Sequence, residues 1–339
     1  MVQRTGKRIK LSDGGGGQAM QRLLSESVIG NLKNVKTKGG IGLEAMDDAA
    51  VIKVGGENLV FTTDSYVVEP VFFKGGDIGK LAICGTINDL AVMGAKPIAI
   101  SCALIISEGF PIKDIERIMK SMNRVSQELD IPIVTGDTKV VGAATGIYIN
   151  TTGIGIAETV IRDSGLQVGD KIIVSGTLGD HGMAILSQRE GIEFETELKS
   201  DCAAVYPMIK ELLDAGIVIH AAKDPTRGGF ANAVNEMAEK SGVCVEIDED
   251  KIPINPAVKS SSEMLGIDPL EVANEGKVVL GIPEKQAKKA LGIIRMNEIG
   301  KHAEIVGRVV VGDRVIMNTV IGGRRILEKP MGDPVPRVC

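Results

Sequence analysis

The segment DIGKLAICGTINDLAVMGAKP, residues 77–97, decides how the first half of the chain is read. Asp77 is a favoured N-cap residue, so a helix is expected to begin just after it. One face of that helix carries the apolar residues Ile78, Leu81, Ala82, Leu90 and Ala91. Gly94 and Pro97 end it. The segment therefore predicts a helix that packs against a core, with a strand following directly.

The sequence on either side of this helix alternates between β-branched runs and amphipathic stretches. Five strands are predicted, at residues 49–54, 59–63, 98–106, 131–134 and 146–157. A second helix is predicted near residues 115–129, where apolar residues recur at helical spacing. A basic, Gly-rich segment with one helical stretch, residues 18–29, precedes them. The pattern is typical of an α+β domain.

The second half of the chain repeats this mixture after a polar, Gly-containing connection at residues 162–170. Strands are predicted at residues 171–175, 243–247, 277–282 and 303–311. Helices are predicted at residues 198–215, 229–240 and 283–297. A length of 339 residues suits two domains. We expect an N-terminal segment (1–42), a first domain (43–160), a second domain (161–329) and a tail (330–339).

The tail, PMGDPVPRVC, differs from the rest of the chain. Its three prolines disfavour both helix and sheet. The tail is therefore predicted to be an extended, flexible arm that ends in the thiol of Cys339. The other four cysteines lie among apolar or small residues and form no C-x-x-C pair, so neither a disulfide framework nor a zinc site is expected.

Composition excludes several classes of function. The net charge is −5, aromatic residues make up 3%, and there is no Trp, which disfavours a nucleic-acid partner. No apolar run approaches the ~20 residues that span a bilayer, and the N-terminus lacks a signal-peptide core. We expect a cytoplasmic protein that acts on neither nucleic acid nor a membrane.

No P-loop motif is present, so a bound nucleotide would need another kind of site. Aspartates beside apolar runs could hold Mg²⁺ ions and phosphates; these are Asp47, Asp48, Asp64, Asp89 and Asp137. The alternative is that turns simply favour Asp at strand ends. The run Gly14–Gly17 could bind an anion or be a flexible terminal segment.

Two further motifs could take part in chemistry. The run DPTRGG, residues 224–229, lies before a helix, where backbone amides and Arg227 could meet an anion. Its alternative is a helix cap with a surface arginine. His181 stands between glycines at 179 and 182, although a single His is more often structural than catalytic.

Taken together, these motifs resemble the hydrogenase maturation factor HypE family of the aminoimidazole-ribonucleotide synthetase (PurM-like) superfamily. The matching stretches are residues 43–52, 62–65, 85–97, 135–141, 179–182, 224–229 and 275–277. The terminal sequence PRVC is the most specific of them. Many members have His before the glycine run, where this chain has Asp13. The resemblance implies two α+β domains, of which the first dimerises through a β-barrel-like interface and the second is an α/β sandwich.

The resemblance also implies the functional residues. ATP would be bound by Asp47, Asp48, Asp64, Asn88, Asp89, Asp137, Thr138, Gly15 and Gly16. Mg²⁺ would be held by Asp47, Asp48, Asp64, Asp89 and Asp137. The implied catalytic residues are Cys339, Glu275, Lys139, His181 and Arg227.

The implied activity is the ATP-dependent dehydration of a carbamoyl group on Cys339 to a thiocyanate, which supplies cyanide to the iron of [NiFe] hydrogenase. The implied partners are the carbamoyltransferase HypF, the HypC–HypD scaffold complex and a second copy of the chain. Two alternatives remain open at this point. One is a small-molecule kinase or amidine-forming synthetase of the superfamily, and the other is an ATP-gated carrier without chemistry.

Overall fold

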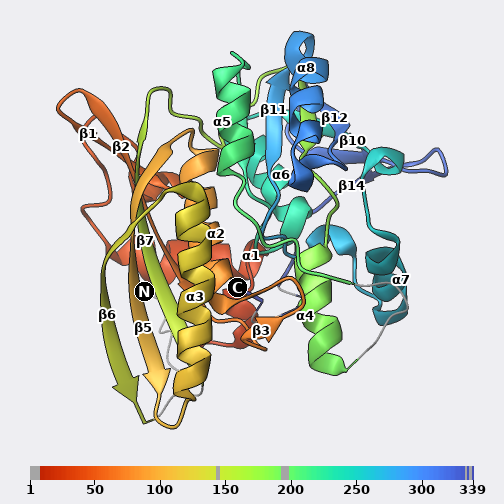
Figure 1. Ribbon diagram of the computed structural model, residues 1–339. Coiled ribbons are helices and arrows are strands. Elements are labelled where there is room, and N and C mark those ends of the chain that lie inside the picture. The colour runs from red at the N-terminus through yellow and green to blue at the C-terminus, as the bar shows by residue number, and fades with distance from the viewer. Residues whose placement is uncertain (1–7, 143–145, 192–197, 333, 336–337) are drawn as a thin grey trace, which may run out of the picture.

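Two large β-sheets organise the computed structural model, which describes residues 8–142, 146–191, 198–332, 334–335 and 338–339 (Figure 1). The first sheet has the strand order β1 (Ala50–Val54), β2 (Glu57–Tyr66), β7 (Ile147–Ala157), β5 (Lys96–Ser107) and β6 (Ile133–Val141). Its neighbours pair antiparallel except β5 and β6, which are parallel. A small hairpin of β3 (Phe72–Phe73) and β4 (Gly76–Asp77) precedes the first long helix.

Two helices cover one face of the first sheet. Helix α2 (Ile78–Val92) begins where the sequence predicts, because the Asp77 carboxylate accepts hydrogen bonds from the backbone N–H groups of Gly79 and Lys80, both at 2.9 Å. Nearly all of α2 is buried between the sheet and the second domain. Helix α3 (Ile112–Leu129) packs on α2 through Ile118, Met122 and Val125 and exposes its other side.

The second sheet has the order β14 (Arg324–Ile326), β13 (Val315–Asn318), β10 (Cys244–Asp248), β12 (Glu304–Val310), β8 (Asp170–Val174), β11 (Val279–Pro283) and β9 (Ala221–Lys223). Helix α6 (Gly229–Ser241) packs on the face that presents Ile172 and Val174. Helices α5 (Tyr206–Asp214) and α8 (Glu284–Met296) pack on the opposite face, which presents Ile173. The strand alternation thus places α-helices on both faces, as in the predicted sandwich.

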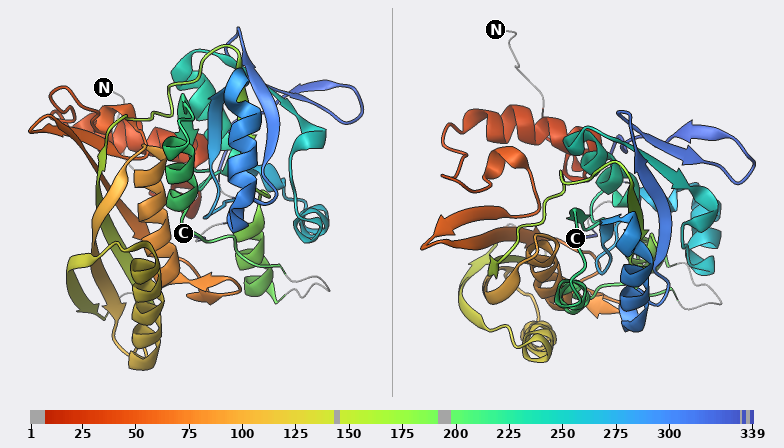
Figure 2. Two further views of the ribbon diagram at one scale, coloured as in Figure 1. Left: turned by 45° about the horizontal axis from the view of Figure 1, so that its top comes forward. Right: turned by 90° about the horizontal axis from the view of Figure 1, so that it is seen from above.

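Shorter elements complete the chain. Helix α1 (Gly17–Leu23) continues into a π-helical turn (Leu24–Val28), and helices α4 (Asp180–Glu190) and α7 (Pro256–Leu265) lie beside the tail end of the molecule. The 3₁₀ turns are Leu11–Gly14, Ile29–Asn31, Leu43–Ala45, Glu249–Lys251, Pro269–Glu271 and Glu298–Gly300. The two domains meet along α2 and α5, as the views from other directions show (Figure 2).

The α+β fold class is confirmed, but several element predictions are wrong. The helix predicted at residues 198–215 begins only at Tyr206, because Pro207 lacks an N–H and fits the first turn. Helices α4 and α7 are not among the predicted elements; α4 has glycines at 179 and 182 about its first turn, and α7 opens with Pro256. The strand predicted at residues 131–134 runs to Val141, because it stays paired with β5 along its whole length.

The tail lies inside the molecule where the structure describes it. Val335 and Val338 are buried in the same apolar cluster as α2 and α4. The backbone carbonyl of Pro330 accepts a hydrogen bond of 3.0 Å from the N–H of Gln18. The predicted extended arm is therefore seen here in a docked position. Within the described ranges no helix is both long and apolar enough to cross a bilayer.

Candidate active site

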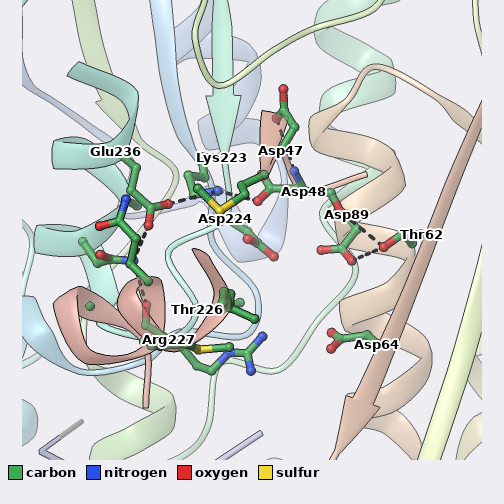
Figure 3. Close-up of a pocket in the computed structure, with 18 of the residues that line it drawn as sticks. Asp47, Asp48, Thr62, Asp64, Asp89, Lys223, Asp224, Thr226, Arg227 and Glu236 are labelled. Atoms are coloured by element: carbon green, nitrogen blue, oxygen red, sulfur yellow. Dashed lines mark hydrogen bonds and ion pairs between the residues drawn. The ribbon is translucent and has the colours of Figure 1, made fainter. Parts of the chain in front are cut away.

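A cavity of about 690 Å³ lies between the two domains, beneath the N-terminal segment. Its first wall is formed by α1 with the turn at Leu43–Ala45, its second by β2 and α2, and its third by residues 223–240 of the second domain. The C-terminal residue, Cys339, also lines it. Figure 3 shows the polar side chains of these walls pointing toward one another.

Five aspartates line this cavity: Asp47, Asp48, Asp64, Asp89 and Asp224. Asp89 accepts a hydrogen bond of 2.7 Å from the hydroxyl of Thr62. The Asp64 carboxylate accepts one of 2.9 Å from the N–H of Ser65, which leaves its other oxygen for the cavity. Four of the five were predicted as ATP and Mg²⁺ ligands, and the fold brings these four together.

Burial makes this cluster reluctant to ionise. Burial, together with the charges of Asp163 and Asp48, raises the pKa of Asp47 to about 6. Burial and the charge of Asp48 raise the pKa of Asp224 to about 8. Burial also raises the pKa of Asp89 well above its usual range, and the charge of Asp224 adds to the effect. These carboxyl groups therefore need positive charge beside them to ionise fully.

Lys223 supplies part of that positive charge. Its ammonium group is ion-paired with Asp48 and lies 3.6 Å from Asp163 and 3.5 Å from Glu236. Burial opposes its charge, but these three carboxylates outweigh that cost and raise the pKa of Lys223. Lys240 pairs with Asp163 and donates to the carbonyl of Met46 at 2.6 Å. The contacts with Asp48 and Met46 join residues 46–48 of the first domain to the second domain.

Several buried carboxylate oxygens still lack a hydrogen-bond partner. In the cavity lining they are Oδ2 of Asp47, Oδ2 of Asp48 and Oε1 of Glu275, of which Asp47 Oδ2 lies 3.7 Å from Nε of Arg162. A buried charged acceptor without a donor is costly, so these oxygens suit a cation or a ligand that donates to them. Among the described residues, however, no three His, Cys, Asp or Glu side chains are arranged to hold a metal ion by themselves. A cation here would need further oxygen ligands.

The glycine run has a steric role in this structure. Gly16 has a positive φ of 81°, and a Cβ there would lie 2.9 Å from the backbone of Arg227. A Cβ on Gly17 would lie 2.2 Å from the carbonyl oxygen of Pro330. These glycines let the N-terminal segment close over Arg227 and over the start of the tail. Gly16 lines the cavity, whereas Gly15 is buried beside it.

The docked tail brings Cys339 into the cavity with Glu275 and Arg227. Burial opposes the charge on Arg227, but the negative charges of Cys339, Asp64 and Glu275 outweigh it and raise the pKa of Arg227. Burial raises the pKa of Glu275 well above its usual range, and the charges of Asp224 and Asp64 add to this. The chain thus places a thiol, an acid of raised pKa and a guanidinium in one cavity.

His181 lies behind the tail, outside the cavity lining. Its Nε2 atom is 2.6 Å from the carbonyl oxygen of Val338, and its Nδ1 atom is 2.7 Å from the hydroxyl of Ser200. Burial lowers the pKa of His181, which favours the neutral ring. In that form Nε2–H donates to Val338 and Ser200 donates to Nδ1. The ring fixes the backbone next to Cys339.

Four other predicted residues also lie outside the cavity. Asn88 hydrogen-bonds across the domain interface, donating to the carbonyl of Ala203 at 3.0 Å and accepting from the N–H of Val205 at 2.8 Å. Asp137, Thr138 and Lys139 lie on the exposed edge strand β6, where Lys139 donates to Asp137 at 2.8 Å. Lys139 and Asp137 expose 65% and 62% of their side chains, so this chain does not bring them to its own cavity.

Sequence reasoning missed Lys223, Asp163, Glu236 and Lys240. Their elements are separate in sequence, and no motif joins them. The one available signal is Lys223 itself, a charged residue that follows two alanines and directly precedes Asp224. A lysine in such a position is rarely buried without partners.

Comparison with family models identifies the two domains. Residues 46–157 match the N-terminal domain of AIR synthase related proteins, and residues 167–319 match their C-terminal domain. A protein of Methanocaldococcus jannaschii, named as a hydrogenase expression/formation protein, is 51% identical over 98% of this chain and 100% of its own. The carbamoyl dehydratase HypE of Rhizobium leguminosarum bv. viciae is 44% identical over 98% of this chain and 95% of its own.

Solved structures give the same result. HypE in its complex with HypF is 42% identical, with a TM-score of 0.84 over 93% of this chain and 100% of that one. HypE in complex with ATP is 38% identical, with a TM-score of 0.81 over 98% of this chain and 100% of that one. On this likeness, the chain belongs to the HypE carbamoyl dehydratases within the family of AIR synthase related proteins.

Proposed function

We propose that the chain dehydrates a carbamoyl group carried on its own Cys339, consuming ATP and leaving S-cyanate. The observation that carries this is the position of Cys339, which lies at the end of a docked tail in the same cavity as the acidic cluster. A structural cysteine would have no need of such a cavity. The relatives named HypE, one of them solved with ATP, support the assignment.

The reaction consists of a phosphoryl transfer and an elimination. The carbamoyl oxygen attacks the γ-phosphorus of ATP, and ADP leaves. The nitrogen then loses its two protons as phosphate departs with the former carbamoyl oxygen, so that S–C(=O)–NH₂ becomes S–C≡N. The chain must hold the carbamoyl oxygen in line with the γ-phosphate and must accept protons from the nitrogen.

Glu275 is the best-placed base. It lines the cavity with Cys339, and its Oε1 atom has no hydrogen-bond partner. The charge of Arg227 favours its ionised form, and once ionised its carboxylate is a stronger base than that of an ordinary glutamate, because its pKa is raised. Arg227 would orient the phosphate or the carbamoyl oxygen, since its guanidinium lies in the same cavity. His181 would position the tail, because both ring nitrogens are already engaged.

The acidic cluster suits Mg²⁺ held jointly with phosphate oxygens. Asp47, Asp48, Asp64 and Asp89 are the proposed ligands, and the Oδ2 atoms of Asp47 and Asp48, which accept no hydrogen bond, fit this role. Bound there, Mg²⁺ would neutralise charge on the phosphates. Lys223 already pairs with Asp48 and would remain beside such a site.

We propose that the chain works as a homodimer. The face of the first sheet opposite α2 and α3 carries the exposed apolar side chains Phe61, Ile98, Ile105 and Ile156. Contiguous exposed apolar residues mark an interaction surface. The cavity reaches this face at Thr63 and Ser65, which line it and are exposed. A second copy on this face could therefore bring its own Asp137, Thr138 and Lys139 to the cavity, which would give the predicted residues of β6 a role.

The proposed partners follow from the chemistry. HypF would load the tail with its carbamoyl group, and a solved complex of HypE with HypF supports HypF as a partner. An iron-bearing scaffold of the HypC–HypD kind would receive the cyanide. The cytoplasm is the proposed location, and neither nucleic acid nor a membrane has a role in this scheme.

Mass spectrometry of the C-terminal peptide tests the function. The protein is incubated with carbamoyl phosphate, a HypF protein and Mg-ATP, with Cys339→Ala as the control. We expect a carbamoyl adduct on Cys339 that becomes one water lighter only when ATP is supplied. An adduct that keeps its full mass, or ATP turnover unaffected by Cys339→Ala, would favour the carrier or the small-molecule enzyme.

A further inference from the structure

A second hollow lies on the first domain, outside the candidate active site. This groove of about 710 Å³ runs between α3, the β3–β4 hairpin and the start of α2. Five of its lining residues are cationic: Lys80, Lys113, Arg117, Lys120 and Arg124. The acidic residues that line it are Asp77 and Glu128. Because its cationic residues outnumber its acidic ones, we refer to this hollow as the basic groove.

Two of the five cationic residues have contacts within the chain: Lys80 donates to the carbonyl of Gly75 at 3.0 Å, and the Arg117 guanidinium lies 3.9 Å from the centroid of the Phe72 ring. Four lie on α3 at positions 113, 117, 120 and 124, a spacing that places them on one helix face. All four are exposed, and Lys113, Lys120 and Arg124 form no ion pair among the described residues. Asp77 caps α2, and with Glu128 it leaves five cations facing two carboxylates in the groove. On a protein with a net charge of −5, such a stripe is unexpected.

The dimensions suit an acidic protein segment. Eleven residues of helix separate Lys113 from Arg124, or about 16 Å. About five residues of extended chain span the same length. A nucleic acid is less suitable, since among the described residues that line the groove Phe73 alone is aromatic, whereas single strands bind by stacking on several aromatic side chains.

The basic groove adjoins the anchor of the tail. Phe73 lines the groove and places its ring edge-on to that of His181, with the centroids 5.5 Å apart. His181 in turn lies 2.6 Å from the carbonyl oxygen of Val338, the residue before Cys339. A partner seated in the groove is therefore one aromatic contact away from the group that fixes the docked tail.

We propose that the basic groove binds an acidic segment of the protein that loads Cys339 with its carbamoyl group. This rests on the proposed function, because only a chain that carries its substrate on its tail needs a loading partner. The groove holds the partner by charge, while its place beside Phe73 and His181 aligns the partner with the tail as it leaves the cavity. Complementary charge of this kind mainly raises the rate of encounter and makes binding sensitive to salt.

Charge reversal tests the groove, with a HypF protein as the probe. Lys120→Glu with Arg124→Glu removes the charge of the stripe without changing buried residues. Lys285→Glu with Lys288→Glu, on the exposed face of α8, is the matched control with the same change in net charge. We expect at least a tenfold weaker Kd for the groove variant and a smaller change for the control. Salt should weaken the wild-type complex much more than that of the groove variant.

Three results would overturn this proposal. The first is equal weakening by the two pairs of substitutions, and the second is no weakening by either. The third is competition for the groove by single-stranded RNA but not by poly-glutamate, which would assign it to nucleic acid.

A separate assay keeps the proposed function distinct. Potassium cyanate S-carbamoylates thiols directly, so Cys339 can be loaded without any partner. The groove variant loaded in this way should lose water with ATP at the wild-type rate. If chemically loaded wild type also fails to react, the proposed function fails, while the binding result still decides what the groove does.

Discussion

The aspartates of the cavity and Asp137 on β6 are predicted for one site, yet the fold buries the first group and leaves Asp137 exposed to solvent. Asp47, Asp48 and Asp89 are enclosed between domains, and burial raises their pKa values. Asp137 lies on an exposed edge strand, where the hydrogen bond from Lys139 lowers its pKa. The first group forms the enclosed acidic site that we propose for cations and phosphates, and the second remains solvated.

This difference separates two kinds of motif residue. The carboxylates that one chain brings together are costly to ionise, because they are buried and repel one another. A bound cation would lower that cost. Residues that remain solvated at an edge have no such cost, so their role requires another molecule. The comparison therefore predicts that substitutions in the two groups will behave differently.

The largest effect is expected from Asp89→Asn. It removes a carboxylate from the enclosed group while keeping its size, so ATP-dependent phosphate release should fall by roughly a hundredfold or more. The Tm should not fall, because the buried Asp89 carboxyl is already held toward its neutral form. Phosphate release and thermal unfolding on the same preparation measure both. A variant that releases phosphate at the wild-type rate would contradict the assignment of the cavity.

A mixed dimer tests the second group. Asp89→Asn and Asp137→Asn protomers are each expected to be inactive as homodimers. If Asp137 serves the cavity of the partner subunit, a heterodimer of the two variants has one cavity with both residues intact. Random exchange in an equal mixture should then restore about a quarter of the wild-type activity, since half the dimers are mixed and half their sites are complete.

The outcome separates three arrangements. Recovery near a quarter supports service to the partner subunit. No recovery, with an inactive Asp137→Asn homodimer, would mean that Asp137 acts on its own chain after a rearrangement. A fully active Asp137→Asn homodimer would remove Asp137 from the site.

The sequence predicted the elements whose signals are local. Helix α2 was found because Asp77 caps it and Gly94 ends it, and these signals act within a few residues. Helix α4 is not predicted, because its N-cap is Gly179, with a φ of 82°, and no side chain caps it. Strand β6 was predicted too short because its extent is set by pairing with β5, a partner from a distant part of the chain.

The site divides along the same line. Asp47, Asp48, Asp64 and Asp89 each stand beside an apolar run, so they could be proposed from sequence and resemblance. The Lys223 network joins residues 175, 60 and 13 positions apart, which no local pattern encodes. The docked position of the tail depends on burial of Val335 and Val338, whereas its prolines alone indicate an extended arm.

A smaller effect is expected at the anchor of the tail, which belongs with the enclosed region. His181→Ala removes the donor to the carbonyl of Val338, so Cys339 should spend more time outside the cavity. Its reaction with a soluble thiol reagent should become severalfold faster. His181→Gln keeps an N–H donor and should restore part of the protection. Equal rates in wild type and both variants would show that the ring does not hold the tail.

The smallest effect concerns stability and pH in the absence of ATP and metal. Asp224 has a pKa of about 8 in the folded protein and about 4 when unfolded, so folding takes up a proton between these values. Stability from this group therefore falls as pH rises from about 4 to 8, and changes little above that. The Tm of the wild type should drop by about 2 °C or more between pH 6 and pH 8.5.

Asp224→Asn removes this proton uptake, so its Tm should vary less with pH and should exceed that of the wild type at pH 8.5. Asp137→Asn provides the contrast, because the lowered pKa of Asp137 affects stability only in acid. Its Tm should follow the wild-type curve across pH 6 to 8.5. If both substitutions flatten the curve equally, the pH dependence does not arise from the enclosed carboxylates. The cost of ionising buried carboxylates, which distinguishes the cavity from β6, would then be absent.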